Sequence, residues 1–339
     1  MKMMTKRERV EAALNGKEVD RVPHSIWLHF PHKDQDPRSL AEHQVGFMKK
    51  YDHDFIKLMP FGLYGVQDYG AKVKIFGTKT EPPIIDQYGI KDIKEWERVG
   101  VFNGTYGTLG KQVQLSQHVS RLLQKEKDDI PFVQTIFSPL TTAEKLAGPR
   151  LYEDLKQYPN IIHQALQNIT ETTINFIKEN INAGVSGFFF ATKCSTLDLM
   201  TKEEYTEFGT KYDLQLFESY KSETFFNIIH IHGENTMFEE LAAYPGNCIS
   251  WHDRWVAPDM GEARKITDKC LLGGLNERDT LVNGTPEDID THVMEAIEMA
   301  GRKSLMIGPG CVAKPETPEI NYFAARVAVE KYGRYKSKT

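Results

Sequence analysis

The sequence predicts an α/β fold, a (β/α)8 barrel of the TIM type, from two observations. From about residue 130 onward, short apolar runs typical of buried strands alternate with longer segments of helical period. Two further strand-like runs lie upstream, which brings the expected strands to eight. Such alternation indicates a parallel sheet, and eight parallel strands with helices between them are best satisfied by closure into a barrel. An open sheet is the weaker alternative.

The expected elements follow one another along the whole chain. The strands span residues 25–29, 55–59, 132–137, 187–191, 226–230, 248–251, 271–275 and 305–308. The helices span residues 39–50, 108–125, 160–182, 202–221, 236–243, 259–267, 286–300 and 318–331, and those after Thr285 and Thr317 carry Thr-Pro-Glu capping signals. Residues 60–107 are rich in Gly, Tyr and Pro without a strong period, so we expect a long loop insertion that builds part of the substrate mouth. No linker divides residues 1–339, which we expect to form one domain.

Composition excludes several classes of function. The net charge is −5 and no basic stretch is present, which argues against a nucleic-acid partner. The longest apolar run, about residues 183–191, is far shorter than the roughly 20 residues that cross a bilayer, so we expect no membrane contact. The first residues lack the pattern of a signal peptide, which predicts a cytoplasmic protein. In that reducing compartment the four cysteines are expected to be buried, metal-bound or catalytic rather than joined in disulfides. The four are Cys194, Cys248, Cys270 and Cys311.

The ends of the fifth and eighth expected strands carry metal-ligand residue types, at the edge where barrels of this kind hold their reactive groups. His230 and His232 close the fifth strand, and alternate residues of an extended segment share one face. Cys311 follows the eighth strand after Gly-Pro-Gly. Two imidazoles and a thiolate suit a catalytic zinc, which keeps three protein ligands and an open position; Glu234 is a further candidate ligand. Alternatively, the histidines are hydrogen-bonded rim residues and Cys311 is a small apolar side chain.

Other residues at the strand ends are candidates for contact with a substrate or with the ligands. The candidates for substrate contact are Trp27, His29, Tyr64, Ser138 and Lys193. The candidates for a catalytic role are His252, Asp253 and Asn276. A purely structural role at the rim explains each of them at least as well. A Schiff base at Lys193 would need a desolvated amine of lowered pKa, and nothing in the neighbouring sequence demands one.

Several motifs are shared with a known family. They lie at residues 5–9 through 21–23, at 51–57, at 137–140, and at 308–311 followed by 315–321, and the last of these is the most specific. With them, the whole chain resembles the uroporphyrinogen decarboxylase superfamily, which holds the haem-pathway decarboxylase and the corrinoid-linked methyltransferases that act on coenzyme M and related acceptors. The resemblance implies a barrel of that superfamily.

Two features of the decarboxylase branch are missing. That branch carries an arginine-rich Arg-x-x-Arg-Gln-Ala-Gly-Arg element after the first strand, for the carboxylates of the porphyrinogen, and an aspartate near the second strand for the pyrrole nitrogens. This chain has Leu28-His29-Phe30-Pro31 and Met59-Pro60-Phe61-Gly62 at those places. A highly anionic substrate would keep unpaired carboxylates there. Tetrapyrrole decarboxylation is therefore the disfavoured alternative.

The methyltransferase branch is the better match. It uses a zinc held by a His-x-Cys pair at strand five and by the cysteine of a Gly-Pro-Gly-Cys turn at strand eight, which His230 and Cys311 match. His232 stands in place of the middle cysteine, and this exchange would leave the metal more Lewis acidic. The resemblance thus implies zinc as cofactor, a methylated corrinoid on a separate carrier protein as donor, and a small acceptor such as a thiol. A non-catalytic barrel that binds a corrinoid is a further alternative, and donor, acceptor and oligomeric state stay open.

Overall fold

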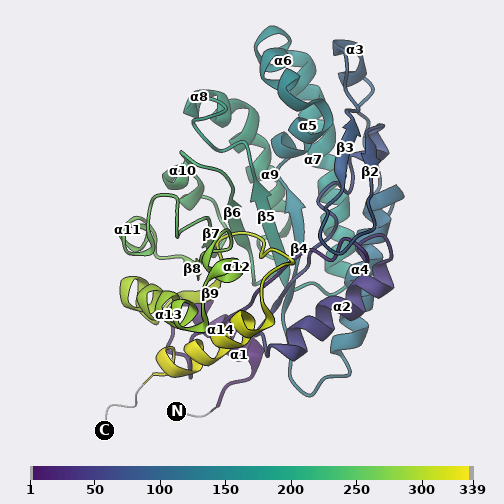
Figure 1. The fold of residues 1–339 in the computed structure, drawn as a ribbon. Helices are drawn as coiled ribbons and strands as arrows, with labels where there is room; N and C mark the ends of the chain where they lie inside the picture. Colours follow the sequence, from purple (N-terminus) through teal and green to yellow (C-terminus); the bar gives the residue numbers. More distant parts are fainter. Residues whose placement is uncertain (1–2, 336–339) are drawn as a thin grey trace.

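A parallel β-sheet that curls into a half-barrel forms the centre of the molecule in the computed structural model, which describes residues 3–335 (Figure 1). Its seven strands follow the order β1-β4-β5-β6-β7-β8-β9, and all neighbours are parallel. They are β1 (Ile56–Lys57), β4 (Phe132–Phe137), β5 (Gly187–Thr192), β6 (Ile228–Ile231), β7 (Cys248–Ser250), β8 (Cys270–Leu275) and β9 (Leu305–Pro309). Nearly all their residues are buried, as continuous apolar runs covered on both faces require. The predicted α/β class with a parallel sheet is confirmed.

The predicted strand at residues 25–29 is not a regular strand, so the prediction of eight regular strands is wrong at this place. The segment makes only isolated parallel bridges, from His24 to β9 and from Leu28 to the chain that follows β9. On its other side, the Ser25 hydroxyl donates to the Phe55 carbonyl oxygen over 2.8 Å. A side-chain hydrogen bond thus stands where a regular strand pair would have a backbone hydrogen bond. The segment therefore lies between the two edge strands, β9 and β1, without continuous pairing to either.

Helices cover the outside of the sheet (Figure 1). They are α1 (Lys6–Leu14), α2 (Pro37–Lys50), α3 (Ile93–Trp96), α4 (Gly107–Leu123), α5 (Pro139–Ala147), α6 (Leu151–Gln157), α7 (Pro159–Asn182), α8 (Lys202–Tyr205), α9 (Lys211–Tyr220), α10 (Phe238–Ala242), α11 (Met260–Ile266), α12 (Thr280–Asn283), α13 (Pro286–Ala300) and α14 (Glu319–Tyr332). Each predicted helix is present with slightly shifted bounds, and a π-helical segment, η3 (Thr206–Thr210), joins α8 to α9. The structure also contains α1, α3, α5, α6 and α12, which are absent from the predicted set. No helix within residues 3–335 is long and apolar enough to cross a membrane.

The segment 60–107 holds short regular elements. These are the 3-10 helix η1 (Gln67–Tyr69), the antiparallel pair β2 (Lys72–Lys74) and β3 (Ile84–Gln87), and helix α3. The hairpin is largely exposed. A second 3-10 helix, η2 (Gly148–Arg150), joins α5 to α6. Only the first residues of the segment, Pro60 and Gly62, reach the cavity described below.

Candidate functional site

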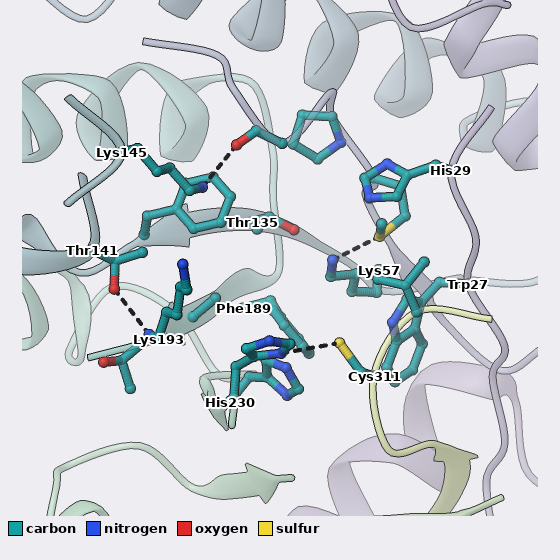
Figure 2. Close-up of a pocket in the computed structure, with 18 residues that line it drawn as sticks. Trp27, His29, Lys57, Thr135, Thr141, Lys145, Phe189, Lys193, His230 and Cys311 are labelled. Atoms are coloured by element: carbon teal, nitrogen blue, oxygen red, sulfur yellow. Dashed lines mark hydrogen bonds between the residues drawn. The ribbon is translucent and has the colours of Figure 1, made fainter. Parts of the chain in front are cut away.

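A cavity of about 200 Å³ opens at the carboxyl ends of the strands (Figure 2). Its walls come from the segment after His24, the ends of β1, β4, β5 and β6, helix α5 and the turn after β9. The largest apolar side chains in these walls are Trp27, Phe137 and Phe189. Among residues 3–335, the side chains that line the cavity include no aspartate or glutamate. The cavity is therefore mostly apolar, and its charged groups are cationic.

His230, His232 and Cys311 meet at one wall of this cavity. Their ligand atoms all lie within 4.8 Å of one another, and the Cys311 Sγ is 3.8 Å from His232 Nδ1. Figure 2 shows His230 and Cys311 near each other at this wall. His230 is in β6 and His232 follows the strand, so alternation along an extended backbone puts both rings on one side. A Cβ at Gly310 would lie 2.9 Å from a Glu277 oxygen, so only glycine lets the Cys311 turn approach this closely. We call these three residues the ligand triad.

Burial controls the protonation of the triad. Burial lowers the pKa of His230 well below the ordinary histidine value and lowers that of His232 to about 4. Both rings are therefore neutral near pH 7 and keep a lone pair for a metal. Burial also raises the pKa of the Cys311 thiol to about 11, so this group must lose a proton when it binds a cation. The donor set is the one that zinc prefers, namely imidazole nitrogen and thiolate sulfur.

A buried carboxylate supports the triad from behind. Glu277 Oε1 lies 2.6 Å from His252 Nδ1, and because a carboxylate only accepts, that nitrogen donates. The Trp255 Nε1 donates to the same oxygen over 3.1 Å. His252 Nε2 in turn lies 3.1 Å from His232 Nδ1. The chain of contacts from Glu277 through His252 thus fixes the orientation of a triad ring, as carboxylate–histidine pairs do at metal sites.

The residues predicted to contact a substrate divide into two groups. Trp27, His29 and Lys193 line the cavity. Tyr64 is buried behind the lining, where its hydroxyl donates to the Thr135 carbonyl oxygen over 2.6 Å. Ser138 is also buried behind it and caps α5. The structure therefore brings three of the five to the cavity wall.

The remaining predicted residues lie apart from the cavity lining. Asp253 is buried and accepts hydrogen bonds from the Gly274 amide, and burial raises its pKa to about 7. The Asn276 side chain accepts from the backbone amides of the next turn and holds that loop. Glu234 is exposed, and its carboxylate lies 3.9 Å from the Arg278 guanidinium group. Among the described residues, it does not belong to the ligand triad. His252 is the predicted catalytic residue that contacts the triad directly.

Two lysines and a glutamate of the site are absent from the predicted set. Lys57 lies within the predicted strand 55–59, and a charged residue in the middle of an apolar strand is a signal that could have found it. Lys145 lies on α5 and also lines the cavity. Glu277 directly follows the predicted Asn276, but nothing in the sequence distinguishes it as the partner of His252.

The chain is thus an α/β half-barrel with residues that could hold a metal ion at the carboxyl ends of its strands. Comparison with known proteins defines its family. The model of the uroporphyrinogen decarboxylase family matches residues 5–332, so this chain belongs to that family. The predicted resemblance is confirmed.

Relatives of nearly full length are methyltransferases by name. The methylcobamide:CoM methyltransferase MtbA of Methanosarcina mazei is 21% identical over 94% of this chain and 95% of its own length. MtaA of Methanosarcina barkeri, of the same name, is 22% identical over 98% and 99%. A uroporphyrinogen decarboxylase of Christiangramia forsetii is 30% identical, over 30% of this chain and 31% of that protein. A solved structure of a methyltransferase from Methanosarcina mazei shares the fold, with a TM-score of 0.84, 20% identity and coverage of 97% and 99%.

Proposed function

We propose that this chain is a zinc-dependent methyltransferase, which moves a methyl group between a corrinoid on a separate carrier protein and a small acceptor such as a thiol. The observation that carries the proposal is the convergence of His230, His232 and Cys311 on one wall of a small cavity. The full-length relatives named as methylcobamide:CoM methyltransferases support the reaction class. The cavity, at about 200 Å³, is also smaller than the roughly 300–1,000 Å³ of pockets for drug-sized ligands, which favours a small acceptor over a tetrapyrrole.

The triad fits the metal that this proposal requires. Its two neutral imidazoles and one thiol are the number and kind of ligands found in catalytic zinc sites. A bound zinc would act as a Lewis acid that lowers the pKa of a coordinated thiol. The chain itself would hold the acceptor against this wall and exclude water from it, because the neighbouring side chains of Trp27 and Phe189 are apolar and buried.

The predicted site residues receive roles that agree with their positions. We assign His252 to orienting His232, since the two rings are in contact. We assign Trp27, His29 and Lys193 to contacting the acceptor, because they line the cavity.

We further propose that residues 1–339 form one cytoplasmic domain. We also propose that the segment from His24 to Leu28 acts as the eighth strand of a closed barrel, between β9 and β1. The bridges of this segment to the β9 side support that closure. Slow amide exchange at Ser25, as slow as in β9, would support closure, and exchange at the rate of an exposed loop would contradict it.

Metal analysis tests the proposal directly. We expect protein purified without added metal to contain about one zinc per chain, and His230→Ala and Cys311→Ala to lose it. Cys270→Ala is the matched control, because this cysteine is buried at the start of β8 and is not a member of the triad. Zinc-free wild-type protein, or full zinc retention in His230→Ala, would overturn the proposal.

Methyl transfer from methylcobalamin to a panel of thiols, followed by corrinoid absorbance, tests the reaction. We expect turnover in wild type and in Cys270→Ala, and no turnover in Cys311→Ala. Binding of methylcobalamin without transfer to any thiol would instead indicate a corrinoid-binding protein. Unchanged turnover in Cys311→Ala would contradict the role of the triad.

A further inference from the structure

The outer face of α14 carries an exposed row of side chains spaced four residues apart. The row consists of Glu319, Phe323, Val327 and Lys331, and we call these four residues the α14 row. Phe323 is 40% exposed and Val327 is 62% exposed, and Ile320, beside the start of the row, is 57% exposed. The opposite face of the helix is buried against the rest of the protein. Single exposed apolar residues are ordinary on a protein surface, whereas a contiguous apolar patch is typical of an interaction surface.

The α14 row borders a groove on the outside of the molecule, between the C-terminal end of α2 and α14 (Figure 1). The groove is lined by the apolar side chains of Tyr51, Phe323 and Val327 and otherwise by charged side chains. The Tyr51 and Phe323 rings meet edge to face with 4.8 Å between their centres, and this contact fixes Phe323 at the surface. An apolar centre with a charged surround is the usual composition of a protein–protein interface.

The two ends of the α14 row carry opposite charges. Glu319 lies in the first turn of the helix and Lys331 in the last turn, and both side chains are exposed. Within the chain, Glu319 pairs with Lys50 over 2.7 Å and Lys331 pairs with Asp290 over 2.9 Å. Exposed ion pairs of this kind contribute little to stability, so both charged groups can pair with another molecule instead.

A two-fold axis midway between Phe323 and Val327 maps the α14 row onto itself. A second copy of α14 that runs antiparallel then places Glu319 of each copy against Lys331 of the other, and Phe323 of each copy against Val327 of the other. A two-fold interface requires this self-complementarity, because the same patch contributes both sides. Rows of residues four apart are also the ridges that interdigitate in the commonest class of helix packing in globular proteins.

We propose that the α14 row is the contact surface of a homodimer, in which two copies of the chain pair through α14 about this two-fold axis. Phe323 and Val327 bury apolar surface at the centre, and the Glu319–Lys331 contacts fix the antiparallel direction. None of the described residues that line the cavity belongs to α14, so the dimer leaves the cavity open and does not rest on the proposed function. A single pair of helices makes a small interface, so we expect a dissociation constant of about 1–10 µM.

Sedimentation equilibrium of the full-length protein over a range of concentrations measures this constant. We expect wild type to pass from the mass of one chain to the mass of two. Phe323→Glu and Val327→Glu should each raise the dissociation constant about 100-fold or more, because every dimer would then bury two unpaired carboxylates at its centre. Leu214→Glu, at an exposed leucine on α9, is the matched control and should leave the constant within about twofold of wild type.

An exchange of charges tests the direction of the pairing. Glu319→Lys and Lys331→Glu should each weaken the dimer about tenfold, because the symmetry turns two attractions into two repulsions. The double variant should return to within about threefold of wild type, since opposite charges again meet across the axis. Within one chain, the exchange brings like charges together at both Lys50 and Asp290, so the monomer itself cannot produce this recovery.

Three results would overturn the proposal. Wild-type protein may not remain monomeric at about 100 µM, whether alone or in complex with a separate carrier protein. A dimer that persists in Phe323→Glu and Val327→Glu would place the interface on another face of the molecule. A double charge variant as weak as the two single variants would exclude the antiparallel pairing. Circular dichroism and thermal unfolding of each variant, compared with wild type, check that the monomer is intact.

Discussion

On the proposed function, in which the triad binds zinc, replacing Glu277 by glutamine should weaken that binding without removing any ligand. The carboxylate is buried and accepts from the Nδ1 of His252, whose other nitrogen contacts His232. Glutamine has nearly the same size and can still accept through its carbonyl oxygen, so the ring positions should persist. What the substitution removes is the negative charge. That charge is felt at the triad, because it adds to the rise that burial causes in the pKa of Cys311 and offsets part of the fall that burial causes in the pKa of His232.

The structure sets the size of the effect. A hydrogen bond to a charged group contributes about 1.5–3 kcal/mol and a neutral one about 0.5–1.5 kcal/mol, so the 2.6 Å bond should lose about 1–1.5 kcal/mol. This corresponds to roughly tenfold weaker zinc binding. Loss of the direct attraction between the carboxylate and a dication adds to it, and outer-sphere partners of metal-bound histidines are worth about 10–100-fold in affinity. We therefore expect a zinc dissociation constant about 10–100-fold higher in Glu277→Gln.

Competition for zinc against a chromophoric chelator at a fixed pH measures this constant. Glu298→Gln, at an exposed glutamate on α13, removes the same charge outside the site and should bind zinc like wild type. Circular dichroism of each zinc-free protein checks that the fold is intact. If Glu277→Gln stays within about twofold of wild type while Cys311→Ala loses zinc, the carboxylate does not support the triad and the reasoning fails.

Three further predictions concern stability and the approach of Cys311. Burial raises the pKa of Asp213 from 3.8 to about 7. Between about pH 4 and pH 7 the folded state therefore binds more protons than the unfolded state, and the free energy of unfolding falls as the pH rises. From about pH 5 to about pH 8 the free energy of unfolding in urea should drop by about 2–3 kcal/mol more in wild type than in Asp213→Asn, and parallel profiles would refute this. Asp54→Asn removes the negative charge that pairs with the buried Arg9 and Arg21 and should lower the free energy of unfolding by about 3–5 kcal/mol. Asp52→Asn, at a half-exposed residue two positions away, should lower it by about 1 kcal/mol or less in the same assay. Gly310→Ala should weaken zinc binding about tenfold in the chelator assay, because the added Cβ would lie 2.9 Å from a Glu277 oxygen and 3.0 Å from the backbone of Trp251 and His252, directly after β7; unchanged affinity would show that the turn can shift.

The convergence of the triad could be predicted because it depends on local rules. His230 and His232 share a face in any extended segment, and parallel strands bring their carboxyl ends to one edge whatever the details of packing. The turn that holds Cys311 follows the last strand for the same reason. These relations involve only the backbone, so short apolar runs and their spacing were sufficient.

The lysines and Glu277 could not be predicted by those rules. Lys145 lies on α5, and that helix begins directly after β4 with a Ser138 cap and a proline rather than after a polar loop. Glu277 pairs with His252 across neighbouring strand ends, and the match depends on side-chain conformation and on the close approach at Gly310. The missing regular strand near Ser25 has a similar cause, since a hydroxyl replaces a backbone bond there. Contacts between distant side chains decide all these features.

The sign of charge in the cavity bears on which chemistry of the family this chain can perform. The resemblance to the decarboxylase branch implies an aspartate that accepts hydrogen bonds from pyrrole N–H groups. In this chain the described residues that line the cavity include Lys57 at the end of β1 and Lys145 on α5 but no carboxylate, and an ammonium group only donates. Pyrrole N–H groups would therefore meet donors rather than a carboxylate. The lack of an acceptor for the pyrrole N–H groups therefore disfavours a tetrapyrrole, independently of whether a metal is bound at His230 and Cys311.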